Sequence, residues 1–179
     1  MSGPLHARGV LFEQTYGRVE GDSASLGELV ALLSSLADAP VRQCLALTGS
    51  VDQYGLVQAI GAVNEKIEGF FDLCVQHGLD GTHGVLIPQA NASQLMLREE
   101  VIEAVRSGRF TVQTVQTVDE ALEALTGLLA GDLSDPSGDT VNGRVTRRLD
   151  EYARLRRREP RLLRSKAGRG RFVIERMGR

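Results

Sequence analysis

The spacing of hydrophobic residues changes period along the chain and predicts helices that alternate with strands. Between Leu26 and Ala37 the apolar residues recur every three or four positions, which is typical of an amphipathic helix. Residues 85–88 are wholly apolar, as in a strand that is buried on both faces. Thr117 is followed three residues later by Glu120, a capping box that marks the start of another helix.

The same patterns, followed along the whole chain, predict an α/β fold. The predicted strands span residues 10–16, 43–48, 56–60, 85–88 and 110–115. The predicted helices span residues 23–37, 62–77, 98–106, 117–129 and 141–158. Residues 51–55 join the second and third strands at the length of a hairpin loop, and either Ser23 or Ser25 is expected to cap the first helix. This alternation is typical of a mixed sheet with flanking helices.

Length and a change in composition near residue 130 predict one folded domain with a C-terminal extension. A chain of 179 residues is within the range of a single domain. Residues 1–130 hold the predicted strands and most of the helices, whereas residues 131–142 are polar and rich in turn-forming residues. Residues 131–179 are therefore expected to be a polar linker and a basic tail, with one helix and with disorder beyond Pro160.

Composition excludes several classes of protein. Apolar residues make up 42% and charged residues 25% of the chain, and no apolar run approaches the ~20 residues needed to cross a bilayer. The N-terminus has no basic segment followed by an apolar stretch, so no secretory signal is expected. Cys44 and Cys74 are too few for a disulfide framework and lack zinc-ligand spacing. A cytoplasmic protein without a membrane segment is expected.

The net charge of −2 conceals two oppositely charged parts. Residues 1–130 carry 7 basic and 16 acidic side chains, a net charge of −9, whereas residues 131–179 carry 14 basic and 7 acidic side chains, a net charge of +7. The charge of the tail suits an acidic surface, such as the body of a neighbouring subunit, or nucleic acid. Because Tyr152 and Phe172 are its only aromatic residues, a solvated extension is favoured over a nucleic-acid-binding module.

Lysine is rare in this chain, with Lys66 and Lys166 beside 19 arginines. Biased composition explains most such ratios, but arginine cannot replace lysine where the chemistry needs a deprotonated amine. Lys66 is the single lysine of residues 1–130 and lies, by helical geometry, at the edge of the apolar face of the predicted helix 62–77. A half-buried lysine of this kind is a candidate base for a serine nucleophile.

The residues alone leave several assignments open. The glycine-bearing stretches fit neither a phosphate-binding loop nor a dinucleotide fingerprint, so no nucleotide cofactor is expected on this chain. A serine paired with His77 or His83 is not excluded by spacing. Ser23 follows a glycine turn at a helix start, which suits either a nucleophile beside free amide groups or an ordinary cap. Lys66 suits either a base or a solvated lysine paired with a glutamate of its own helix.

Three blocks of the sequence resemble the proteolytic domain of the Lon protease family. Residues 19–25 (VEGDSAS) look like the nucleophile motif of archaeal-type and related bacterial members. Residues 46–50 (ALTGS) match a second block, and residues 55–67 (GLVQAIGAVNEKI) resemble the lysine motif. The order and separation of the three blocks are those of the family, and the resemblance extends over about residues 9–128.

This resemblance implies a serine endopeptidase that uses a Ser–Lys dyad and no histidine. By motif position Ser23 is the nucleophile and Lys66 is the general base. Thr48 is expected to orient the Lys66 amine through its hydroxyl. Asp22 precedes the nucleophile and is expected either to bond to Lys66 in a resting form or to serve as a turn residue. The implied substrates are unfolded or misfolded polypeptides.

The resemblance also implies partners beyond this chain. Family members carry an ATPase module before this domain and assemble as six-membered rings. We therefore expect either a fragment of an ATP-dependent protease or a form that works without ATP. We favour the fragment and expect homo-oligomers, with ATP and magnesium bound outside this chain. Residues 61–62 are Gly-Ala where the family often has two glycines, and the extra methyl is tolerated unless the backbone takes a positive φ. A catalytically silent assembly or regulatory domain of the same fold is the alternative.

Overall fold

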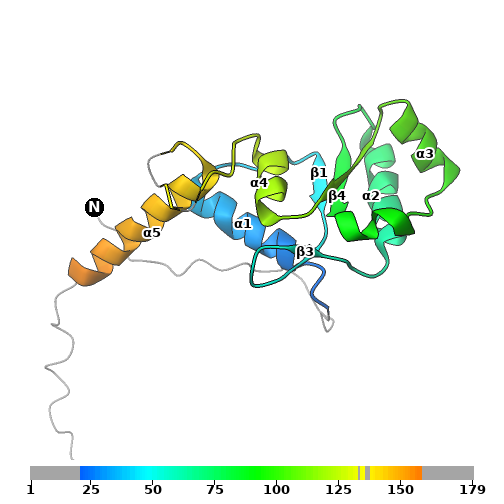
Figure 1. Cartoon of the computed structure of the whole chain (residues 1–179). Helices are drawn as coiled ribbons and strands as arrows, with labels where there is room; N and C mark the ends of the chain where they lie inside the picture. The colour runs from blue at the N-terminus through cyan, green and yellow to red at the C-terminus, as the bar shows by residue number, and fades with distance from the viewer. Residues whose placement is uncertain (1–20, 133, 136–137, 159–179) are drawn as a thin grey trace, which may run out of the picture.

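The structure of the chain, a computed structural model, describes residues 21–132, 134–135 and 138–158. The predicted strand over residues 10–16, most of the turn before the first helix and the predicted disorder beyond Pro160 lie outside these residues. Figure 1 shows the described helices and strands in chain order, with the remaining residues as a grey trace.

The described strands form two separate sheets. Strands β1 (Leu45–Leu47), β4 (Gly84–Pro88) and β5 (Thr111–Val115) form a parallel sheet in the order β1-β4-β5. Strands β2 (Ser50–Val51) and β3 (Val57–Gln58) form an antiparallel ribbon. In the parallel sheet the carboxyl ends of all three strands meet at one edge, the place where open α/β sheets bind their ligands.

Helices flank the parallel sheet, so the predicted α/β fold is confirmed. They are α1 (Ser25–Ala37), α2 (Val63–His77), the 3₁₀ helix η1 (Gln89–Gln94), α3 (Glu99–Arg106), α4 (Val118–Thr126) and α5 (Val141–Arg158). Within the described part of the chain, no helix is both long enough and apolar enough to cross a membrane.

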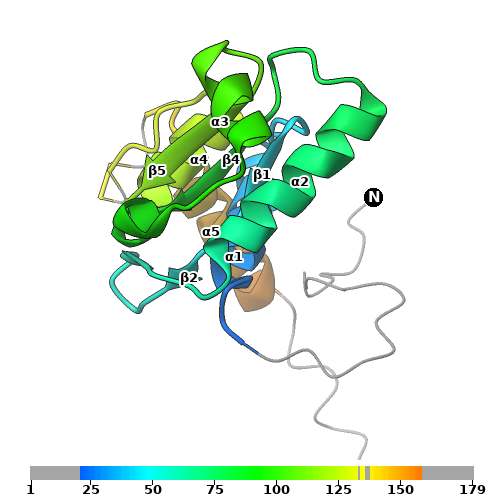
Figure 2. The same ribbon diagram turned by 90° about the vertical axis from the view of Figure 1, so that its right-hand side faces the viewer.

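The central strand β4 separates two hydrophobic cores. Leu86 packs with α1, α4 and the start of α5, whereas Val85 and Ile87 pack with α2 and α3. Neighbouring residues of a strand point to opposite faces of the sheet, and every residue of β4 is buried, as its apolar run predicted. Figure 2 shows α2 and α3 on one side of the sheet and α1, α4 and α5 on the other. The molecule therefore has three layers.

The hairpin after β1 differs from the prediction. Strand β1 pairs in parallel with β4, and the hairpin instead joins β2 to β3, with Ser50 opposite Gln58. Gly49 separates β1 from β2 at a point where the chain passes close to α1. A side chain there would place its Cβ 2.8 Å from Leu26 Cδ2 and 3.1 Å from Val57 Cγ1, so a larger residue at this bend would have to displace the buried Leu26 side chain.

The helix ends show which capping predictions hold. The Glu120 amide donates to the Thr117 hydroxyl at 3.2 Å, so the predicted cap of α4 is confirmed. That helix ends at Thr126, earlier than predicted, because Gly127 turns into the left-handed region with a φ of 73°. The predicted serine cap of α1 is wrong. Its N-cap residue is Ala24, and no side chain caps the helix.

The predicted helix over residues 141–158 is confirmed, and its first turns lie in the core. Val141 and Val145 are buried among residues of α1 and α4. Figure 1 shows α5 beside α1 and extending beyond it. Arg144 pairs with Asp139, and other basic residues of α5 also have acidic or carbonyl partners nearby. The division of the chain at residue 130 stays a prediction.

Candidate active site

Ser23 and Lys66 meet although 43 residues separate them in the sequence. The Lys66 Nζ donates to the Ser23 Oγ at 2.8 Å. Ser23 lies just before α1, and Lys66 lies in the first turn of α2, so the contact joins the two helical layers. Both residues are half-buried. The Ser23 hydroxyl therefore serves a tertiary contact and does not cap a helix.

The backbone of Ser23 is fixed to the carboxyl end of β1. Its carbonyl oxygen accepts hydrogen bonds from the Thr48 hydroxyl at 3.2 Å and from the Gly49 amide at 3.0 Å. The Thr48 amide in turn donates to the Leu86 carbonyl of β4 at 3.1 Å. These bonds tie Ser23 to the central strand of the sheet. Among the described residues, the Thr48 hydroxyl contacts the Ser23 carbonyl. The expected role of Thr48 in orienting the Lys66 amine stays a prediction.

The residues on either side of Ser23 are held by the β2–β3 ribbon. The Ser50 hydroxyl donates to the Asp22 carboxylate at 2.7 Å, and the Val51 amide donates to the Ser25 hydroxyl at 3.1 Å. In the part of the chain that the structure describes, Asp22 and Lys66 form no ion pair. Of the two roles expected of Asp22, the bond to Lys66 is not seen here, and its carboxylate instead accepts from Ser50, a residue that the sequence reasoning did not single out.

Packing of α2 brings the Lys66 side chain to the edge of the core. Val63 and Ile67 on the same helix are buried against the sheet. Glu68, one of the acidic neighbours of Lys66 on α2, is engaged with Arg98 through both the Arg98 amide at 2.8 Å and its guanidinium at 3.3 Å. Among the described residues, Glu68 is thus paired with Arg98 and not with Lys66.

The residue that begins α2 is in a backbone conformation that alanine rarely adopts. Ala62 is the N-cap of α2 and has a φ of 57° and a ψ of 37°. Its carbonyl accepts from the Lys66 amide at 3.2 Å, so it belongs to the turn that carries the lysine. The sequence analysis expected alanine to be tolerated at position 62 only if the backbone φ there is negative. Because the φ of Ala62 is positive, its left-handed backbone carries a conformational cost.

We expect Ala62→Gly to stabilise the protein by about 0.5–1 kcal/mol, because glycine adopts this conformation without the steric cost of Cβ. Chemical denaturation measures the change. Ala153→Gly is the matched control, since Ala153 is exposed within α5 and glycine there costs about 1 kcal/mol. Equal destabilisation by both substitutions would contradict the strained backbone at residue 62.

Neither of the described histidines, His77 and His83, is part of this site: His77 ends α2, whereas Lys66 lies in the first turn of that helix. His83 Nδ1 lies 3.0 Å from Asp80 Oδ1, just before β4. The pKa of Asp80 is lowered chiefly by a hydrogen bond from the Thr82 hydroxyl, with a smaller contribution from His83. His83 therefore lies at the amino end of the parallel sheet, whereas Ser23 lies at the carboxyl end of β1. A Ser–His–Asp triad that joins Ser23 to either described histidine is incompatible with this arrangement.

The setting of Cys74 does not favour its use as an alternative nucleophile. Both cysteines are free thiols; Cys44 is half-buried, and Cys74 is buried on the core-facing side of α2. Burial raises the pKa of the Cys74 thiol, and the nearby Asp80 raises it further. A thiol with a raised pKa forms less of the reactive thiolate.

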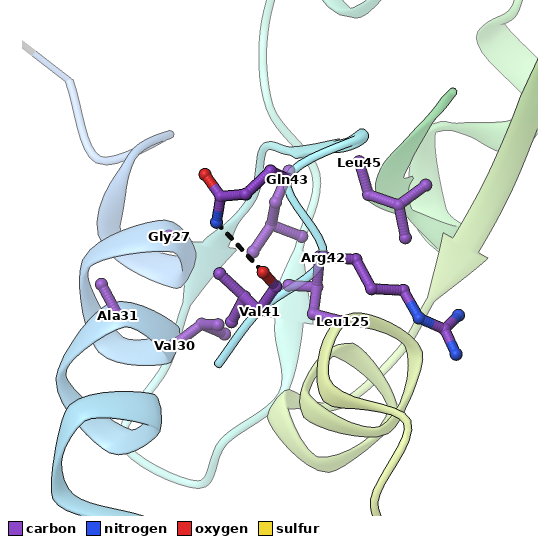
Figure 3. A pocket seen from close by; sticks show the side chains of 9 residues that line it. Gly27, Val30, Ala31, Val41, Arg42, Gln43, Leu45 and Leu125 are labelled. Atoms are coloured by element: carbon purple, nitrogen blue, oxygen red, sulfur yellow. Dashed lines mark hydrogen bonds between the residues drawn. The ribbon is translucent and has the colours of Figure 1, made fainter. Parts of the chain in front are cut away.

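Two hollows lined by described residues include neither Ser23 nor Lys66. Figure 3 shows a pocket of about 210 Å³ between α1, the outer edge of β1 and the end of α4. Its lining is mostly apolar, and the guanidinium of Arg42 points away from the other lining residues. A second hollow of about 660 Å³ lies over α2 and α3. Neither contains a nucleophile with a base, so chemistry and not volume identifies the site.

No group of three or more potential metal ligands occurs among the residues that the structure describes. The candidate site therefore consists of a serine hydroxyl, a lysine amine and the backbone groups around them.

Comparison with known proteins identifies the fold that carries this serine and lysine. Residues 17–127 match the family described as the Lon protease (S16) C-terminal proteolytic domain. The chain belongs to the Lon protease family. Its membership indicates a serine-peptidase domain, and the match includes both Ser23 and Lys66.

Named relatives of this Lon proteolytic domain are bacterial and archaeal. A Lon protease homologue of Escherichia coli K12 is 47% identical over 146 residues, and one of Haemophilus influenzae is 44% identical over 146 residues. These alignments cover 81% and 82% of the present chain. An archaeal Lon protease of Methanocaldococcus jannaschii is 39% identical over 92 residues, which is 51% of the present chain and 13% of that protein.

The chain spans only part of these relatives. The aligned residues are 25% of the Escherichia coli protein and 23% of the Haemophilus influenzae protein. The similarity therefore covers the proteolytic domain. The activity, substrates and partners of a whole protein are proposals.

Proposed function

We propose that this Lon proteolytic domain is a serine endopeptidase in which Ser23 is the nucleophile and Lys66 is the general base. The observation that carries the proposal is the 2.8 Å separation of Lys66 Nζ and Ser23 Oγ. A general base must lie within hydrogen-bond reach of the proton that it removes. The Ser23 hydroxyl does not cap α1, which also supports its assignment as the nucleophile.

The proposed reaction follows the order of acyl transfer. A neutral Lys66 amine accepts the hydroxyl proton while Ser23 Oγ bonds to the carbonyl carbon of the substrate peptide. Lys66 then returns the proton to the leaving nitrogen as the carbon–nitrogen bond breaks. Water attacks the resulting ester, Lys66 takes the proton of that water, and Ser23 recovers its own proton as the new carboxyl product leaves.

The start of α1 supplies groups that could stabilise the oxyanion. The amides of Ser25 and Leu26 already donate to the carbonyls of Asp22 and Gly49. We assign the oxyanion contacts to the amides of Ser23 and Ala24, which lie at and next to the proposed nucleophile, immediately before α1. Thr48 would then act as a positioning residue, because its hydroxyl holds the Ser23 carbonyl.

The wider function that we propose follows from the family and from the partial length of the match. The substrates are unfolded or misfolded polypeptides, and the assembly is a homo-oligomer, with a hexameric ring as the expected form. ATP dependence would reside in a separate ATPase module of a longer protein, and the compartment would be the cytoplasm. Relatives about four times as long as the aligned segment are consistent with such a module.

Digestion of casein, an unfolded polypeptide, tests the proposal. The chain is expected to cleave internal peptide bonds, which mass spectrometry identifies as new termini on both sides of each cut. Pretreatment with a serine-reactive fluorophosphonate should stop the cleavage. Intact casein, together with an intact short fluorogenic peptide, would favour the alternative of a catalytically silent assembly domain.

A further inference from the structure

A buried serine holds the acidic neighbour of the proposed nucleophile. Ser50 lies in β2 opposite Gln58 of β3, and its side chain is 3% exposed. Its hydroxyl donates to Asp22 Oδ2 at 2.7 Å. Asp22 is otherwise exposed and lies directly before Ser23 in the chain. A carboxylate next to the nucleophile is thus fastened to the ribbon by one hydrogen bond.

The position of this carboxylate matters because Lys66 is so close. Lys66 Nζ lies 2.8 Å from the hydroxyl of Ser23, the residue that follows Asp22. A carboxylate within reach of an amine favours the protonated form of that amine. A protonated Lys66 has no lone pair and cannot accept the proton of Ser23. An Asp22 side chain that turned from Ser50 to Lys66 would therefore oppose the proposed reaction.

Among the residues that the structure describes, the other charged groups around Lys66 have partners or belong to exposed positions. On α2 itself, Glu68 is engaged with Arg98 and Glu65 is exposed. On the β2–β3 loop, Asp52 accepts the amides of Tyr54 and Leu56. Residues 89–97, which contact α2 through Asn64, carry no charged side chain. On α1, Glu28 is exposed. Within the described part of the chain, Asp22 is thus the carboxylate next to the reacting pair, and the hydrogen bond from Ser50 is what holds its side chain.

We propose that Ser50 is a positioning residue that keeps the Asp22 carboxylate on the β2–β3 ribbon and so leaves the Lys66 amine free to act on Ser23. The proposal deepens the Ser–Lys function proposed above and rests on it for its effect on catalysis. Its structural part, the control of Lys66 protonation by the placement of Asp22, is measurable without any cleavage.

The lysine content of the chain makes this measurement direct. Lys66 and Lys166 are its only lysines, so isotope-labelled lysine gives two sets of side-chain NMR signals, and Lys166→Arg assigns them. In Ser50→Ala, the pH at which the Lys66 signals titrate is expected to rise by about one unit relative to the parent. Lys166 serves as the internal control and should not change.

The double variant separates electrostatic placement from a merely structural role. Ser50→Ala combined with Asp22→Asn removes the charge that would reach Lys66, so its titration should return to that of the parent. An unchanged Lys66 titration in Ser50→Ala would overturn the proposal. A rise that persists in the double variant would also overturn it, because the cause would not be Asp22.

Casein cleavage across the pH range provides the second readout. The acid limb of kcat/KM should move to higher pH in Ser50→Ala by about the same unit and return in the double variant. If the Lys66 titration moves as expected but the parent cleaves no casein, the placement of Asp22 stands and the peptidase function fails. If the parent cleaves casein and neither readout moves, the peptidase function stands and the role of Ser50 fails.

Discussion

Lys66→Arg is expected to lower kcat/KM for casein by about 10³-fold at neutral pH. Arginine keeps the positive charge and much of the side-chain length, but it stays protonated at any working pH. It can still donate to the Ser23 hydroxyl across a distance like the present 2.8 Å, yet it cannot accept the proton. The substitution therefore separates the need for an amine from the need for a cation.

Lys166→Arg is the matched control for this variant, because it makes the same chemical change at the other lysine of the chain. Its casein cleavage should equal that of the parent. Thermal unfolding verifies that Lys66→Arg folds, as expected for a half-buried side chain at the edge of the core. Cleavage by Lys66→Arg within tenfold of the parent would exclude the amine as the base.

Ser23→Ala is expected to abolish casein cleavage, with a fall of at least about 10⁴-fold. The substitution removes the oxygen that attacks the peptide carbonyl. It leaves the backbone bonds of residue 23 to Thr48 and Gly49, which involve the carbonyl oxygen alone. Fold stability should therefore change little, and the loss should be seen in kcat at saturating casein.

Ser107→Ala provides the comparison for the nucleophile variant. Ser107 is exposed at the end of α3, where its hydroxyl donates to the Glu103 carbonyl. We expect this variant to cleave casein like the parent. If Ser23→Ala retained activity comparable with that of Ser107→Ala, another residue would have to be the nucleophile.

Helical periodicity predicted α2 and the place of Lys66 at its apolar edge, because Val63 and Ile67 mark the buried face. Periodicity could not predict which residue the amine meets, since that contact spans two layers of the fold. The three motif blocks supplied the missing information, because their order implied that Ser23 and Lys66 act together. The 2.8 Å contact is therefore a test of the motif and not of the periodicity.

Several features had weak signals in the sequence. Strands β2 and β3 have two residues each, too few for an alternating pattern to be recognised. The buried apolar side chains of α5 are Val141 and Val145, which are four residues apart in a helix whose other residues are mostly polar or charged. The positive φ of Ala62 had no signal in the residue type, since alanine disfavours that conformation.

Ser50 is the site residue that sequence reasoning had the means to find. It closes the block of residues 46–50 that contains Thr48, and a hydroxyl at that place was visible in the motif. Its hydrogen bond to Asp22 depends on the turn between β1 and β2 and on the bend at Gly49. The sequence motif of residues 46–50 therefore marked a functional segment, but only the contacts in the structure show what Ser50 does within it.

Covalent labelling of the chain with a fluorophosphonate, followed by peptide mapping, tests most directly whether the Lys66 amine activates the Ser23 hydroxyl. Parent and Lys66→Arg are labelled under the same conditions across the pH range, with Lys166→Arg as the control. We predict one adduct, on Ser23, in the parent and in Lys166→Arg, and its loss in Lys66→Arg. An adduct on a different residue, or equal labelling of Ser23 with arginine at position 66, would contradict the Ser–Lys site.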